Sequence, residues 1–184
     1  TIVLNAETIA NAYSDTAANL AAAFDGITTV TAGMTISGST VATIAELKTM
    51  NAATNNTIVL NAESIANNYT DTAANLVSAF TGITTVTGTL TVSDTGSVAA
   101  ADLNTIDGVS SGTITATAVA TITGSAADIA TASAGVTIGG DEALTITGSA
   151  VASIANLKTM NAATTGTITL NAQSIANAYS DTAA

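Results

Sequence analysis

The sequence contains no cysteine, histidine, arginine or tryptophan, and each of these absences removes a class of function. Without cysteine there is no disulfide framework and no thiolate metal site. Without histidine or cysteine, the nucleophile–base arrangements of the common hydrolases cannot be assembled. We therefore expect a protein that is not an enzyme and that has no catalytic residues.

Positive charge is also scarce. Two basic side chains, Lys48 and Lys158, stand against 13 acidic ones, which gives a formal net charge of −11. Nucleic-acid binding depends on lysine and arginine side chains that release counterions from phosphates, so we expect no nucleic-acid partner. Threonine, serine and glycine interrupt the apolar segments, and we expect no membrane insertion because a bilayer span needs a continuous apolar run.

The apolar residues that are present are of an unusual kind. They make up 47% of the chain, yet aromatic residues account for only 3%. Alanine, isoleucine, valine and leucine therefore provide nearly all of the candidate core. Small and β-branched side chains suit thin, regular layers better than a globule packed around large rings.

One phrase recurs along the chain at a nearly constant interval. Thr1-Ile-Val-Leu-Asn-Ala-Glu returns at Thr57, in a shorter form at Thr113, and again at Thr167, with offsets of 56, 56 and 54. Such intervals are the signature of tandem repeats. The extent of the identity excludes chance: 25 of 31 positions between residues 1–31 and 57–87, 12 of 14 between 41–54 and 151–164, and 15 of 18 between 1–18 and 167–184.

These repeats predict an α/β fold, a solenoid-like array of tandem ββα units. The repeats are 1–56, 57–112, 113–166 and an unfinished 167–184, and we expect the chain to be a window of a longer array. Each long repeat divides into two units of strand, bend, strand and short helix. The unit boundaries are 1–26, 27–56, 57–82, 83–112, 113–135 and 136–166.

Local patterns place the strands and helices of these units. Alternation of isoleucine, valine and leucine with threonine predicts short strands. Helices are predicted over 71–80, with Asp71 as its N-cap and Gly82 ending it, and over 149–160. The strand pair in 136–147 has the bend most typical of a hairpin, although an arc between two sheets remains the alternative.

Recurring residues share a register across the units. Tyrosine recurs at Tyr13, Tyr69 and Tyr179, and asparagine at Asn5, Asn61 and Asn171. If equivalent residues stack on one another, they form aromatic and amide ladders between neighbouring units.

Few residues qualify as binding sites. Asp141 and Glu142 follow two glycines and form a candidate calcium site, since carboxylate oxygens are the ligands that calcium prefers. Asp15, Asp71 and Asp181 form a column that is interpreted as helix caps rather than as a row of metal ligands. Repeated Thr-x-Thr triplets allow a flat ice-binding face, although threonine is equally typical of an exposed strand.

The phrase Asp-Thr-Ala-Ala-Asn-Leu, at residues 15–20 and again at 71–76, resembles the tandem repeats of very long Thr/Ala/Gly-rich secreted bacterial proteins. These include cyanobacterial and RTX-like surface proteins and adhesins. The resemblance implies an extracellular or cell-surface structural protein that self-associates into a filament, stalk or surface layer. The alternative is the repeat shaft of an adhesin or phage fibre, which would bind a cell-surface or host-surface glycan through regions outside this sequence.

Overall fold

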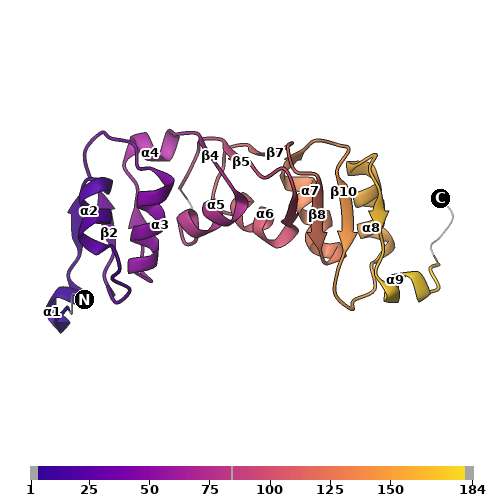
Figure 1. Cartoon of the computed structure of the whole chain (residues 1–184), viewed down its shortest axis with the longest axis horizontal. Coiled ribbons are helices and arrows are strands. Elements are labelled where there is room, and N and C mark those ends of the chain that lie inside the picture. The colour runs from indigo at the N-terminus through magenta and orange to yellow at the C-terminus, as the bar shows by residue number, and fades with distance from the viewer. Residues whose placement is uncertain (1–3, 84, 181–184) are drawn as a thin grey trace.

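The computed structural model describes residues 4–83 and 85–180 of the chain. The molecule is elongated, and the chain advances from one end to the other (Figure 1). Segments that follow one another along the chain therefore lie side by side. Helices and parallel β-strands make up the regular structure. The α/β class predicted from the sequence is therefore confirmed.

Longer helices pack in a row in chain order, and one of them falls within each of the six expected units. They have eight to ten residues and are α2 (Ala17–Phe24), α3 (Ile44–Ala53), α5 (Ala73–Phe80), α6 (Ala100–Asp107), α7 (Ala126–Gly135) and α8 (Ile154–Ala163). Helices of five residues are α1 (Ala6–Ala10), α4 (Ala62–Ala66) and α9 (Ala172–Ala176).

The strands are two to four residues long, and every pairing between them is parallel. The three sheets have the orders β1-β2-β3, β4-β5-β7-β9 and β6-β8-β10-β11. Each strand pairs with strands of the neighbouring units, as Tyr13 does with Met34, and Met34 with Ile58. The strands are β1 (Tyr13–Asp15), β2 (Met34–Ile36), β3 (Ile58–Val59), β4 (Tyr69–Asp71), β5 (Leu90–Val92), β6 (Ser97–Ala99), β7 (Ile114–Ala116), β8 (Thr121–Gly124), β9 (Thr137–Ile138), β10 (Ala143–Ile146) and β11 (Ile168–Thr169).

The hairpin predicted for residues 136–147 is wrong. Strands β9 and β10 do not pair with each other: β9 pairs with β7, and β10 pairs with β8 and β11. The bend at Gly140, which has a φ of +87°, carries the chain from one sheet to another. This is the arc alternative, in which each strand finds its hydrogen bonds on a strand of a neighbouring unit.

The helix starts differ from the prediction by one residue. Thr16 and Thr72 are the N-caps of α2 and α5, and each hydroxyl accepts a hydrogen bond from the N–H group three residues later. Asp15 and Asp71, the predicted caps, instead end strands β1 and β4. Because their backbone belongs to the sheet, the following threonine makes the cap. The helix predicted over 149–160 is displaced further: α8 has Ser153 as its N-cap and spans Ile154–Ala163.

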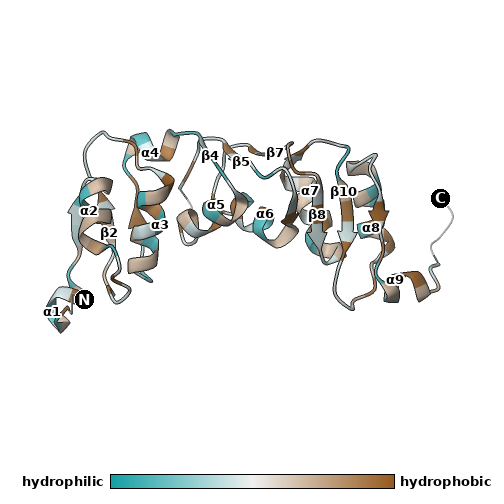
Figure 2. Ribbon diagram, in the orientation of Figure 1, coloured by the Kyte–Doolittle hydropathy of each residue, from teal (hydrophilic) through white to brown (hydrophobic). Residues whose placement is uncertain are grey.

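The hydrophobic core is one cluster of buried apolar side chains that extends through all the units. Helices and strands both contribute to it, and hydrophobic and hydrophilic residues are interspersed along the whole length of the molecule (Figure 2). Residues without any exposed surface include Leu47, Leu76, Leu103, Ile129 and Leu144. The buried side chains of successive helices and strands therefore belong to one continuous core.

The predicted aromatic ladders are wrong. Tyr13 packs edge-on against Phe24, with ring centroids 4.7 Å apart, and Tyr69 packs in the same way against Phe80 at 5.0 Å. Both pairs lie within one unit. The strand of Tyr13 pairs with that of Met34, and the strand of Met34 pairs with that of Ile58, so one whole unit separates Tyr13 from Tyr69. Equivalent rings are therefore not on adjacent units.

The predicted amide ladder is wrong for the same reason. Asn5, Asn61 and Asn171 are the N-caps of the five-residue helices. The Nδ2 group of Asn61 also donates hydrogen bonds to the carbonyls of Gly38 and Thr40, both at 2.9 Å. Each asparagine of the two later repeats therefore ties its helix to the backbone of the preceding unit rather than to another asparagine.

Hydroxyl groups make further connections between successive segments. Thr54, Ser110 and Thr164 occupy equivalent positions, and each donates to a carbonyl 22 residues earlier at 2.7 to 3.1 Å. Each hydroxyl also accepts a hydrogen bond from the N–H group two residues later. Ser64 and Ser174 are fully buried and accept from an N–H group 22 residues earlier, both at 2.9 Å. These bonds fix the register of one segment on the next.

Replacing Ser64 by alanine is expected to lower the free energy of unfolding by about 1–3 kcal/mol, because the N–H group of buried Ala42 loses its acceptor. Urea denaturation followed by circular dichroism measures the change. The control is Ser78→Ala, at an exposed position of α5, which should change stability by less than about 0.5 kcal/mol. Equal effects of the two substitutions would contradict the role of the buried hydroxyl.

Candidate functional site

The candidate calcium ligands Asp141 and Glu142 lie in the bend between β9 and β10. Glu142 is only 2% exposed, and its Oε2 accepts a hydrogen bond of 2.8 Å from the N–H group of Gly140. Its other carboxylate oxygen, Oε1, is buried and has no hydrogen-bond partner. Burying a carboxylate oxygen without a partner is unfavourable, so this oxygen is the unusual feature of the bend.

Other oxygens gather next to the same side chain. A Cβ atom placed on Gly139 would lie 3.1 Å from both Asp141 Oδ1 and the carbonyl oxygen of Thr117, and 3.4 Å from Glu142 Oε2. The structure thus brings together the two carboxylates that the sequence singled out and adds a backbone carbonyl from the preceding unit. Carboxylate and carbonyl oxygens are the donors that fit calcium.

Asp15 and Asp71, from the other predicted column of acids, accept hydrogen bonds from residues of the helix that follows. Asp15 Oδ1 accepts hydrogen bonds from Thr16 N–H at 2.7 Å and from Asn19 Nδ2 at 2.9 Å. These bonds, the Asn19 bond above all, hold the pKa of Asp15 below its usual value. Asp71 has the equivalent bonds, and Asp181 lies outside the described residues. Across residues 4–83 and 85–180, no group of three or more acidic side chains is arranged to hold a metal ion.

Some threonines of the triplets, among them Thr91, Thr115 and Thr145, belong to two rows on different sheets. Thr70, Thr91, Thr115 and Thr137 are in register across β4, β5, β7 and β9. A second row, of Thr123, Thr145 and Thr169, crosses β8, β10 and β11. All seven side chains are exposed or half-buried, which places them on the outer face of their sheets as the alternation predicts. The rows are short and separate, so the described residues do not combine them into one broad flat surface.

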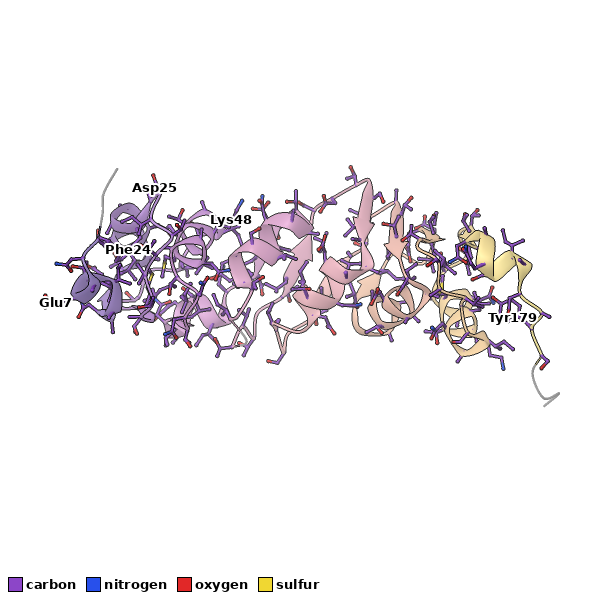
Figure 3. The ribbon with its side chains drawn as sticks, turned by 90° about the horizontal axis from the view of Figure 1, so that it is seen from below. Glu7, Phe24, Asp25, Lys48 and Tyr179 are labelled. Carbon is purple, nitrogen blue, oxygen red and sulfur yellow. The ribbon has the colours of Figure 1, made fainter. Side chains whose placement is uncertain are left out.

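A hollow that the sequence did not reveal lies at the C-terminal end of the molecule. It is next to α8 and has a volume of about 440 Å³. Tyr179 forms part of its wall and is 38% exposed. Figure 3 shows this residue near the C-terminal end of the molecule. The lining residues are Ile154, Leu157, Lys158, Asn161, Ile168 and Tyr179. Mostly apolar side chains therefore border an open surface at this end.

Two further observations complete the description of the chain. None of the helices in its described part has the length and hydropathy that crossing a bilayer requires. No protein-family model, no curated protein and no solved structure matches the sequence or its fold.

Proposed function

We propose that the chain is part of a solenoid of tandem ββα units that serves as a non-enzymatic structural element outside a bacterial cell, in a filament, stalk or surface layer. The observation that carries this proposal is the parallel register. Every strand pairs with a strand of a neighbouring unit, and the long helices pack in the same order. An array in which each unit contacts only its neighbours can be extended without limit, which suits a long structural element.

Surface chemistry supports the same function. The acidic excess of 13 against 2 basic residues favours solubility in salt, where repulsion between exposed charges is screened beyond about 10 Å. Several recurring polar residues have hydrogen bonds to the backbone of a neighbouring unit, as Asn61 and Asn171 illustrate. Their repetition is thus explained by architecture, and we propose no catalytic role for them.

Immunogold electron microscopy of the source cells, with an antibody raised against the 184-residue chain, tests this function. Label along extracellular filaments or on a surface layer is the expected result. Label on fibres that end in a distinct unlabelled tip would favour the adhesin or phage-fibre alternative, in which the tip binds the target. Label confined to the cell interior would contradict both.

A calcium ion at the bend of Asp141 and Glu142 is part of the same proposal. The unpartnered Oε1 of Glu142 supports it, because a bound cation would compensate the buried carboxylate. Asp141 and the carbonyl of Thr117 would supply further oxygens. Calcium takes six to eight oxygen ligands, so water or a neighbouring chain must provide the rest.

Calcium is expected to raise the melting temperature of the chain relative to a solution with chelator. A site with a Kd of about 10⁻⁴ M contributes about 1.4 kcal/mol in about 1 mM calcium, or about 3–6 °C for a chain of this size. Glu142→Gln should abolish this shift, whereas Glu63→Gln, at an exposed position of α4, should retain it. Differential scanning calorimetry measures all three proteins. An equal shift in all of them would show that calcium does not act at Glu142.

A further inference from the structure

Lysine is rare in this chain, and Lys48 lies where it contacts a side-chain amide of the next repeat. It belongs to α3 and is located away from both ends of the molecule (Figure 3). Its Nζ group donates a hydrogen bond of 2.5 Å to Oδ1 of Asn75 in α5. Both side chains are half-buried where the two helices pack together. An amine and a carboxamide from different repeats are therefore in direct contact.

The packing of neighbouring helices brings these two positions together, and the pair α6 and α7 has the same contact with other residues. Asn104 holds the position of Lys48 in the next repeat. Asp128, like Asn75, is the third residue after a hydroxyl N-cap. Asn104 Nδ2 donates a hydrogen bond of 3.1 Å to the backbone carbonyl of Asp128. The contact thus follows from the fold, whereas the amine and the carboxamide are specific to α3 and α5.

The amine is within reach of the carbon atom of the amide as well as its oxygen. Because a C=O bond is about 1.23 Å long, a nitrogen 2.5 Å from Oδ1 of Asn75 lies at most about 3.7 Å from Cγ. Reacting atoms held about 3–3.5 Å apart have effective concentrations of about 10⁵–10⁸ M. Lysine amines act as nucleophiles toward carbonyl carbons. The two side chains are therefore placed to react with each other.

A carboxylate holds the nitrogen of the same amide. Asp71 Oδ1 accepts a hydrogen bond of 2.7 Å from Nδ2 of Asn75 and one of 2.8 Å from the N–H group of Thr72. These bonds fix the carboxylate and the plane of the amide. In a displacement at Cγ, Nδ2 must gain a proton before it leaves, and an adjacent negative charge favours the protonated form. Asp71 thus contacts the leaving group while Lys48 contacts the carbonyl oxygen.

We propose that Lys48 and Asn75 form an intramolecular isopeptide bond that links α3 to α5. After one proton is lost to water, neutral Nζ attacks Cγ. The Nζ–Cγ bond forms, the Cγ–Nδ2 bond breaks, and a proton passes from Nζ to Nδ2, which leaves as ammonia. Overall, the lysine ammonium group and the carboxamide become a secondary amide and an ammonium ion, so no other reactant is required.

The bond closes a covalent loop between residues 48 and 75, which belong to successive repeats. The segment inside this loop, with β3 and α4, cannot be extended by tension along the array. Because the contact is only half-buried, the ammonia escapes into solvent and the reverse reaction is negligible. The reaction occurs once in each chain, so it is a self-modification and not turnover. It goes beyond the proposed structural function and does not depend on it.

The mass of the purified full chain tests the proposal, because loss of one ammonia molecule lowers it by about 17 Da. Intact-mass spectrometry of the wild type should show this deficit relative to the sequence mass of 17.8 kDa. Digestion after glutamate and before aspartate should release residues 47–63 and 71–93 as one branched peptide. The branch distinguishes the isopeptide bond from a succinimide, which also loses ammonia but joins no second segment. A wild type of full mass, or a deficit without the branched peptide, overturns the proposal.

Two matched substitutions identify the amine, since the chain has only two lysines. Lys48→Arg keeps a positively charged donor beside Asn75 but removes the nucleophile, so this variant should have its full mass. Lys158→Arg removes the other lysine and should show the same deficit as the wild type. A deficit in the first variant, or its loss in the second, would assign the reaction to a different amine and overturn the pairing.

The role of Asp71 is read from the rate at which the deficit appears after a short pulse of synthesis. Asp71→Asn removes the charge beside Nδ2 and should slow the reaction by at least about 100-fold. Asp15→Asn, which changes the equivalent carboxylate before α2, should react at the wild-type rate. Circular dichroism should show the same fold for both variants. Equal rates for the two would exclude Asp71 from the reaction. None of these results depends on the location of the parent protein, which tests the proposed function separately.

Discussion

A fragment of residues 57–112 is expected to be largely unfolded in water at room temperature, although it is a complete repeat. Its helix α5 packs between α3 and α6, and its strand β5 pairs with β4 and β7. The fragment lacks α3 and β7, so Leu76 and other buried side chains lose part of their contacts. A chain of this size is marginal for independent folding even with a closed core.

The experiment compares residues 57–112, residues 1–112 and the full chain by circular dichroism at equal mass concentration. Stability in such an array is a sum of unit and interface terms, so the melting temperature should rise with each added repeat. If residues 57–112 unfolded cooperatively at the melting temperature of the full chain, each repeat would be a closed domain. The continuous core and the solenoid proposal would then have to be abandoned.

Leu47→Ala is expected to lower the free energy of unfolding by about 3 kcal/mol, or about 6–12 °C in melting temperature. Leu47 is fully buried beneath α5, and the surrounding helices cannot collapse into the space of the lost side chain. Denaturant titration followed by circular dichroism measures the change.

Leu157→Ala is the matched control, because Leu157 holds the equivalent position in α8 and is only half-buried. Its loss should be less than half of that for Leu47→Ala. Equal losses would mean that α5 does not bury this surface of α3.

Much of the secondary structure follows from local patterns in the sequence. The alternation around Leu90 and Ile114 predicts strands with threonine outward, and hydroxyl residues before alanine-rich segments predict the helices to within a few residues. Gly82, with a φ of +81°, ends α5 as predicted. The cap was misplaced by one residue because Asp71 and Thr72 are both good N-cap residues, and only the strand ladder distinguishes them.

Contacts between units did not follow from local patterns. A hairpin and an arc have the same alternation, and the bend around Gly140 resembled a hairpin from its local sequence alone. The choice depends on partner strands in the neighbouring units. The burial of Ser64 and of Glu142 was missed for the same reason. Recurrence of a hydroxyl at positions 54, 110 and 164 was the available signal for the register bonds.

The sequence by itself determined the repeat, its period and the α/β composition of each unit, because capping and periodicity act within a few residues. Only the tertiary structure decided which surfaces are covered. Segments 41–54 and 151–164 show this directly: they are nearly identical in sequence and form the same helix, yet Leu47 is buried and Leu157 is half-exposed. Burial depends on the neighbouring unit, and α5 lies against α3 while no described segment takes its place beside α8.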